Sequence, residues 1–250
     1  MDRDEANTAG DGVEPGTRLV IIRHGEAVTN VEELIGGHDG CRGLTDRGVA
    51  QCEALADRLR ETGELDGAAA VWTSVLPRAV ESAAIVAPAI GFDVVTQSCS
   101  LCEQHPGEAD GISWSEFERR YERVSFPGSD PELPLSPGGE SWIEFLDRAR
   151  SGLLDLAASY PRQLVVAVSH GGVIASSMIR FLGLPEHGSG AQLHAENTSI
   201  TEWVRTGHRW RLIRFNDVAH LFGPGREDVR SMVPAWVNAD SDRAAVDQQV

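Results

Sequence analysis

The sequence has no long hydrophobic run, few cysteines and little positive charge, and each shortage excludes a class of protein. No stretch of its 250 residues approaches the roughly 18 consecutive apolar residues that a membrane-spanning helix needs. Lysine and arginine number 22 against 38 acidic residues, so the formal net charge is −16. This charge disfavours nucleic acid and anionic membranes as partners. The acidic amino terminus does not resemble a signal peptide, and we expect a cytoplasmic protein.

The four cysteines are too few for a disulfide framework in a chain of this length. Cys99 and Cys102 have the C-x-x-C spacing found in zinc and redox sites. No second pair follows, however, and a Glu-Gln-His-Pro segment stands where a redox motif would begin a helix. We therefore expect packed or incidental thiols, with no metal and no cofactor.

Short apolar runs that alternate with amphipathic segments predict an α/β protein. Leu19–Ile22 and Leu164–Val168 are fully apolar and largely β-branched, which is typical of strands buried on both faces of a parallel sheet. Helical spacing of apolar residues predicts helices that begin near Thr45, Arg78 and Ser141. The alternation predicts a three-layer α/β/α sandwich around a mostly parallel central sheet.

Further strands are predicted on both sides of this pattern. Ala68–Thr73 and Phe92–Thr96 follow the first two helices and extend the parallel sheet. Thr198–Val204 and Arg209–Phe215 alternate apolar and polar residues around a Thr-Gly turn, so we expect an antiparallel hairpin at one edge.

Composition divides the chain into one folded domain and two tails. Residues 1–16 and 223–250 lack a clear apolar pattern, and we expect a disordered acidic tail at the first and an unassigned tail at the second. Residues 17–222 form the predicted domain. Within it, residues 104–139 are rich in proline, glycine and acids, which indicates a cap segment inserted over one end of the sheet.

Polar side chains that suit phosphate chemistry follow the predicted strands. Two strands lead into His-Gly pairs, at Arg23-His24-Gly25 and Ser169-His170-Gly171, and a third leads to Arg78. Because the carboxyl ends of parallel strands share one edge of a sheet, we expect these groups to converge. Guanidinium groups bind phosphate oxygens, and a neutral imidazole is a competent nucleophile toward phosphorus. The pattern favours phosphoryl transfer without a metal.

Such chemistry also needs an acid to protonate the leaving group. Glu103 stands at the end of another predicted strand and is our first candidate. Glu108 and Asp110 lie close by in the sequence, and both remain alternatives. The other histidines show no paired ligand spacing, so we expect no metal role for His38, His105, His187, His194, His208 or His220.

Taken together, these motifs resemble the histidine phosphatase superfamily, the phosphoglycerate-mutase-like proteins. The segments that carry the resemblance occur in family order and span roughly residues 18–217: RHGEAVTN (23–30), GLTDRG (43–48), TSVLPRAVESA (73–83), LCE (101–103), GGES (138–141), SHGG (169–172) and NTSI (197–200). Two positions depart from the family pattern, since Ala27 stands where threonine or serine is usual and Ser82 replaces a common threonine. Neither change removes a charged group.

The resemblance implies a role for specific residues. His24 is implied to be the nucleophile that becomes phosphohistidine, and Glu103 the proton donor that later activates water. The phosphate pocket is implied to comprise Arg23, Arg78 and His170, with Asn30 as a further phosphate contact.

The resulting expectation is a metal-independent phosphomonoesterase that acts on a small-molecule phosphate monoester. A cofactor-dependent phosphoglycerate mutase is the first alternative, but residues 104–139 are shorter than the insertion that such mutases usually carry. A non-catalytic phospholigand-binding protein is a second alternative. A dinucleotide-binding domain is disfavoured because no G-x-G-x-x-G follows any strand. The sequence leaves the oligomeric state open.

Overall fold

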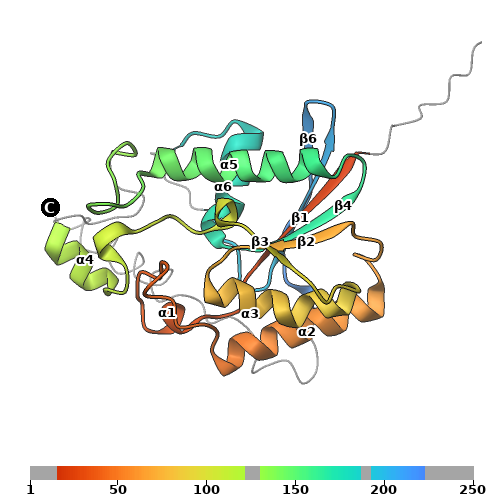
Figure 1. Cartoon of the computed structure of the whole chain (residues 1–250), viewed down its shortest axis with the longest axis horizontal. Coiled ribbons are helices and arrows are strands. Elements are labelled where there is room, and N and C mark those ends of the chain that lie inside the picture. Colours follow the sequence, from red (N-terminus) through yellow and green to blue (C-terminus); the bar gives the residue numbers. More distant parts are fainter. Residues whose placement is uncertain (1–15, 122–129, 187–192, 223–250) are drawn as a thin grey trace, which may run out of the picture.

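The computed structural model describes residues 16–121, 130–186 and 193–222 (Figure 1). The predicted tails at 1–16 and 223–250 therefore lie outside the described residues, apart from Gly16. The described chain forms one six-stranded sheet in the order β3-β2-β4-β1-β5-β6. The strands are β1 (Thr17–Arg23), β2 (Ala70–Thr73), β3 (Thr96–Gln97), β4 (Leu164–Ser169), β5 (Ile200–Thr206) and β6 (Arg209–Asp217).

Helices cover both faces of this sheet, with α5 and α6 on one side and α2 and α3 on the other (Figure 1). The helices are α1 (Val28–Val31), α2 (Asp46–Thr62), α3 (Pro77–Val86), α4 (Trp114–Tyr121), α5 (Trp142–Ser159) and α6 (Gly171–Leu182). Short 3₁₀ turns are η1 (Ala87–Ile90), η2 (Cys99–Leu101), η3 (Gly107–Ala109) and η4 (Ala219–Leu221). The predicted α/β sandwich is confirmed.

Local sequence signals set the ends of the long helices. The Thr45 hydroxyl accepts a hydrogen bond from the backbone of Gly48 and so caps the start of α2. Gly63 ends that helix in the left-handed conformation, which glycine adopts without a steric cost. Ser141 and Glu144 form a reciprocal capping box at the start of α5.

The central strand β1 separates two hydrophobic cores. Leu19 and Ile21 face the core beneath α5 and α6, whereas Val20 and Ile22 face the core beneath α2 and α3. All four side chains are at most 1% exposed, because β1 pairs with β4 on one side and β5 on the other. The apolar run predicted this two-sided burial correctly.

The antiparallel edge is also confirmed, but the opposite edge is shorter than expected. β5 and β6 pair antiparallel, as the alternating pattern predicts. The predicted strand Phe92–Thr96 is largely wrong, since β3 comprises only Thr96–Gln97 beside β2. The apolar residues of this segment have different surroundings. Phe92 and Val95 pack against the cluster under α2 and α3, whereas Val94 is 79% exposed.

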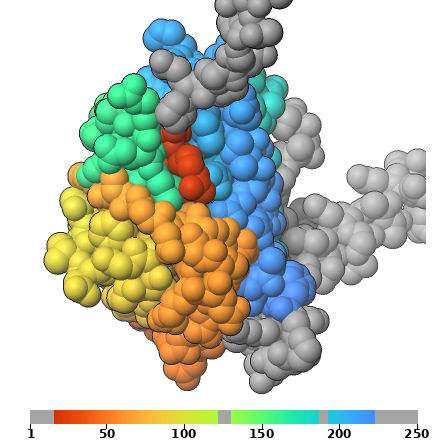
Figure 2. All heavy atoms as spheres, turned by 90° about the vertical axis from the view of Figure 1, so that its right-hand side faces the viewer, coloured from red at the N-terminus to blue at the C-terminus, as the bar shows by residue number. Residues whose placement is uncertain are grey.

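The amino ends of the parallel strands lie at the end of the molecule that is farther from α4 (Figure 1). Figure 2 views this end of the molecule, where the start of β1 (red) lies between the end of α5 (green) and the β5–β6 hairpin (blue), with the α2 region (orange) below. Four ion-paired side chains join the helix to the hairpin, with Arg58 and Arg214 each bonded to Glu64 and Asp217. This cross-link ties α2 and the residues that follow it to β6.

The opposite end of the sheet carries α1 and α4 (Figure 1). A small separate core forms there from Ile35, Ala109, Phe117 and Leu135. It links the loop after α1 to the predicted cap segment, of which residues 122–129 are outside the description. Within the described ranges, no helix has the length and apolar character to cross a bilayer.

Candidate active site

The parallel pairing of β1 and β4 brings the two His-Gly motifs together. Arg23 lies opposite Ser169 in the register, so the next residue of each strand is a histidine. The backbone N–H of His24 donates to the Ser169 carbonyl at 2.9 Å. The ring centroids of His24 and His170 are 5.1 Å apart, at an interplanar angle of 61°. The predicted convergence of these two side chains is therefore present in the fold.

Hydrogen bonds fix the orientation of the His24 ring. Its Nδ1 lies 2.6 Å from the carbonyl oxygen of Gly25, which assigns the ring proton to Nδ1 and leaves a lone pair on Nε2. The Arg78 Nε group donates to that Nε2 at 3.1 Å. The ring is buried, with 3% of the residue exposed. Nε2 is consequently the nitrogen that faces the charged groups of the site.

Two guanidinium groups flank the histidine pair from different elements. Arg78, in the first turn of α3, is buried, and its Nη1 donates to the Gly36 carbonyl at 2.9 Å. Arg23 ends β1 and is half-buried, and it donates to the Ala195 carbonyl. Burial lowers the pKa of Arg23, and the nearby Glu103 carboxylate opposes that shift. Positive charge is thus concentrated locally in an acidic protein.

His170 lies at the centre of this site and is fully buried. Among the described residues, neither its Nδ1 nor its Nε2 has a hydrogen-bond partner, and Arg23 Nε is similarly unpaired. A buried polar group without a partner is costly in a folded protein. An anion held between these groups would accept a hydrogen bond from the one ring N–H of neutral His170 and from Arg23 Nε.

Both histidines are held neutral near physiological pH. The pKa of His24 lies well below 6.5 because burial disfavours the charged ring, and the Arg78 and Arg23 guanidinium groups add repulsion. The pKa of His170 is lowered for the same reasons, first by burial and then by the charge of Arg78. A neutral ring keeps the Nε2 lone pair that a nucleophile requires.

The Glu103 carboxylate lies at the amino terminus of α6. Its Oε2 accepts a hydrogen bond from the Gly172 backbone N–H at 3.0 Å. The segment that carries it is fastened to β4, where the Ser169 hydroxyl donates to the Leu101 carbonyl at 2.7 Å. Glu103 therefore lies beside the helix that begins immediately after His170.

The two alternative acids have other partners. Glu108 is exposed and lies 3.6 Å from Arg120. Asp110 accepts hydrogen bonds from three backbone N–H groups of the loop after α1, at Gly37, Asp39 and Gly40. These contacts give Asp110 a structural task in holding that loop.

Asn30 occupies a more peripheral position than the other predicted phosphate ligands. It lies in α1, is exposed, and its Oδ1 accepts from the Ala27 backbone N–H at 2.9 Å. Asn197 was not assigned a role from the sequence, although the NTSI segment contains it. Its Nδ2 donates to the His24 carbonyl at 3.1 Å, and so supports the backbone at His24.

Ser82 also contributes to the site through the backbone. Its hydroxyl accepts a hydrogen bond from the Gly25 N–H at 3.0 Å. A serine hydroxyl supplies the same acceptor as the commoner threonine, so this departure from the family pattern keeps the contact.

The structure also brings two histidines to the C-x-x-C pair, a connection that the sequence did not predict. Cys99 and Cys102 lie beside His38 and His105, and their potential ligand atoms are all within 4.8 Å of one another. We expected incidental thiols and isolated histidines here. The sequence separation of 61 residues between His38 and Cys99 hid the arrangement.

Burial of the two neutral histidines predicts an acid-sensitive fold. An unfolded histidine titrates near pH 6.5, whereas the native rings stay neutral to lower pH, so the unfolded state alone gains protons as pH falls. At about pH 5.5 each histidine should have lowered the free energy of unfolding by on the order of 1 kcal/mol relative to neutral pH.

The free energy of unfolding of His170→Asn, measured with urea, should therefore fall less steeply between about pH 7.5 and about pH 5.5 than that of the parent chain. His208→Asn, in the exposed β5–β6 turn, is the matched control and should keep the parental slope. Equal slopes for the parent and His170→Asn would contradict the lowered pKa.

Comparison with known proteins places this geometry in a family. The sequence profile described as the histidine phosphatase superfamily (branch 1) matches residues 19–218. The metal-independent phosphoserine phosphatase of Arabidopsis thaliana is 30% identical over 211 residues, which cover 84% of this chain and 85% of that protein.

Solved structures show the same similarity in three dimensions. YhfR from Bacillus stearothermophilus superposes with a TM-score of 0.72 at 28% identity, covering 82% of this chain and 100% of that one. The mycobacterial glucosyl-3-phosphoglycerate phosphatase Rv2419c superposes with a TM-score of 0.65 at 28% identity, covering 80% of this chain and 98% of that one.

Proposed function

The chain belongs to the histidine phosphatase superfamily, as its motifs suggested, and we propose that it hydrolyses phosphate monoesters through a phosphohistidine formed on His24. Its family and the phosphatases among its relatives identify it as a phosphoric monoester hydrolase. The observation that carries the proposed mechanism is the orientation of His24, whose Nε2 faces Arg78 while Nδ1 is held by the Gly25 carbonyl.

The first proposed step transfers the phosphoryl group to the protein. The His24 Nε2 lone pair attacks phosphorus, the bond from phosphorus to the leaving oxygen breaks, and Glu103 gives its proton to that oxygen. The proton on Nδ1 stays in place, and the Gly25 carbonyl stabilises the positive ring that results. The charge that develops on the phosphoryl oxygens is stabilised by Arg23, Arg78 and His170.

The second proposed step releases inorganic phosphate. The Glu103 carboxylate accepts a proton from water, the water oxygen attacks phosphorus, and the bond between phosphorus and Nε2 breaks. Neutral His24 and protonated Glu103 are restored together. The backbone N–H of Gly171 at the start of α6, together with the Asn30 Nδ2 group at the edge of the site, is proposed as a further phosphate contact.

The proposed substrate is a small phosphorylated metabolite. Relatives are named for phosphoserine and for glucosyl-3-phosphoglycerate, both of which are small monoesters. A panel that contains phosphoserine, phosphoglycerates, sugar phosphates and nucleotide monoesters should show release of inorganic phosphate from one or a few members. Transfer of the phosphoryl group between phosphoglycerate positions without such release would instead identify a mutase.

Catalysis by these residues requires no metal ion, because each proposed charge-stabilising group is a side chain or a backbone N–H. Turnover of an artificial aryl phosphate should therefore stay within about twofold after treatment with a chelator, with or without added Mg²⁺. A strict requirement for Mg²⁺ would contradict the proposed mechanism.

A further inference from the structure

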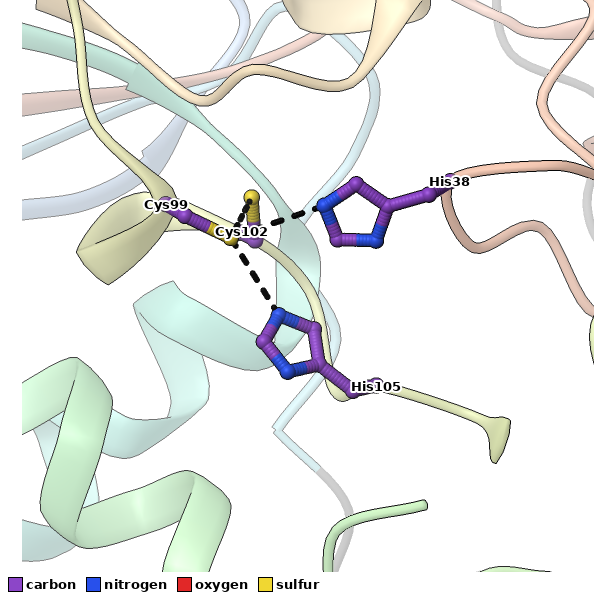
Figure 3. Close-up of side chains that lie close together, drawn as sticks. All are labelled: His38, Cys99, Cys102 and His105. Carbon is purple, nitrogen blue, oxygen red and sulfur yellow. Dashed lines mark hydrogen bonds between the residues drawn. The ribbon is translucent and has the colours of Figure 1, made fainter. Parts of the chain in front are cut away.

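A second group of chemically reactive side chains lies outside the proposed phosphate pocket. Figure 3 shows Cys99, Cys102, His38 and His105 directed toward one another from two different segments. Cys99 begins η2, and Cys102 and His105 follow it in the sequence CSLCEQH. His38 comes from the loop between α1 and α2.

The candidate ligand atoms converge around the sulfur of Cys99. Its Sγ lies 2.9 Å from Cys102 Sγ, 3.3 Å from His105 Nε2 and 3.6 Å from His38 Nε2. The rings of His38 and His105 have centroids 5.2 Å apart. Two thiols and two imidazoles at this spacing match the donor set of a tetrahedral zinc site.

We propose that these four side chains bind one divalent transition-metal ion, with Zn²⁺ as the best match. Cys99 and Cys102 would bind through Sγ, and His38 and His105 through Nε2. An ion about 2.3 Å from each sulfur would hold the two sulfurs about 3.8 Å apart, so a modest side-chain movement completes the geometry. Soft thiolates with two imidazoles favour zinc over magnesium or calcium.

The surroundings contain the supporting contacts that metal ligands usually have. His105 Nδ1, the nitrogen turned away from the sulfurs, lies 3.6 Å from Glu140 Oε1, so a carboxylate stands beside the ring as it does beside many metal-bound histidines. Arg148 holds that carboxylate at 2.6 Å. The Nη1 group of Arg148 also donates to the carbonyls of Cys99 and Cys102, at 2.9 and 3.1 Å. The guanidinium thereby places positive charge beside both cysteines.

Cys102 receives a further contact that suits a thiolate. The Ser74 hydroxyl, after the end of β2, donates to its sulfur at 3.3 Å. Cys102 is fully buried, whereas His38 is exposed. An ion would therefore be bound by the Cys102 sulfur on the side of the protein interior and by the His38 imidazole on the side of the solvent.

The site would join two segments that are otherwise fastened separately. Asp110 holds the loop that carries His38, through the backbone N–H groups of Gly37 and Gly40. The segment with both cysteines also carries Glu103, whose Oε2 is turned to Gly172. The ion would thus cross-link the first loop to the backbone on both sides of Glu103 without touching the phosphate pocket.

The test is metal binding by the reduced, metal-free full-length chain, read by spectroscopy. Added Co²⁺ should bind at one ion per chain and give the thiolate-to-metal charge-transfer band and intense ligand-field bands of a tetrahedral thiolate site, which Zn²⁺ should then bleach. Cys99→Ser and Cys102→Ser should lose these bands. Cys41→Ser and Cys52→Ser remove the other two cysteines and should keep them.

Because His38 is exposed, His38→Ala offers a variant with little risk to the fold, and it should weaken Co²⁺ binding at least about tenfold. Zn²⁺ in excess should raise the Tm of the parent chain by about 5–10 °C and leave that of Cys99→Ser unchanged.

Two results would overturn the proposal. One is the absence of saturable binding by the reduced chain, as expected if the neighbouring thiols serve only to form a disulfide. The other is binding that persists in both cysteine variants. Neither readout depends on phosphatase activity, so the metal site and the proposed mechanism can fail separately.

Discussion

Replacing His24 by alanine is expected to reduce turnover of an aryl phosphate at least about a thousandfold. The variant lacks the Nε2 lone pair that is proposed to form the bond to phosphorus. It should also lose any acid-labile phosphate label. Inorganic phosphate should still bind, since Arg23, Arg78 and His170 remain. Steady-state kinetics and a competition assay with phosphate measure both effects.

The control for His24→Ala is His208→Ala, which removes an exposed histidine from the β5–β6 turn and should retain full activity. Circular dichroism and thermal unfolding check that the His24 variant is folded, because this side chain is buried. A folded His24→Ala protein that retains more than about a tenth of the parental turnover would exclude His24 as the nucleophile.

Glu103→Gln is expected to lower kcat by about 100- to 10,000-fold with little change in the affinity for inorganic phosphate. Glutamine keeps the shape of the side chain but supplies neither the proton for the leaving oxygen nor the base for water. An aryl phosphate, whose leaving group needs less protonation, should still phosphorylate the protein. The phosphorylated protein should then accumulate, which rapid-quench labelling can detect.

Glu108→Gln and Asp110→Asn are the matched controls for this acid. Glu108 is exposed beside Arg120, so its amide variant should have nearly parental turnover. Asp110→Asn should mainly loosen the loop at Gly37, and so affect stability more than kcat. A large loss of kcat in Glu108→Gln, with Glu103→Gln active, would move the acid role to Glu108.

Gly172 offers a second test of Glu103 that leaves the carboxylate intact. A Cβ at Gly172 would lie 2.0 Å from Glu103 Oε1, so alanine there must displace the acid. Gly172→Ala should therefore lose activity at least about tenfold, and thermal unfolding checks that the variant is folded, because the new Cβ would also lie 2.9 Å from the buried Phe145 ring. Unchanged kcat in this variant would mean that the position of Glu103 does not matter for catalysis.

The sequence correctly predicted the strands in which every consecutive residue is apolar and buried. The apolar runs of β1 and β4 identified strands covered on both faces, and the shared rim of parallel strands placed His24 and His170 near each other. The actual register, with Arg23 opposite Ser169, determines how closely the rings approach. That register depends on tertiary packing and is not readable from either strand alone.

Features that depend on contacts between distant, irregular segments were not predicted. Phe92 and Val95 suggested a strand, but both pack against a helical layer instead of extending the sheet. Sequence proximity left Glu108 and Asp110 as alternatives to Glu103, whereas the three backbone hydrogen bonds to Asp110 distinguish it from Glu103. His38 joins the two cysteines only because its loop folds back over η2.

The central claim is that a phosphoryl group is passed to one nitrogen of one histidine. Rapid quenching of the parent protein with substrate under alkaline conditions, followed by peptide mapping with mass spectrometry, tests it most directly. We predict a single phosphorylated residue, His24, with a label that survives base and is lost in acid. A label on any other residue, or turnover with no labelled protein at any time, would contradict the account.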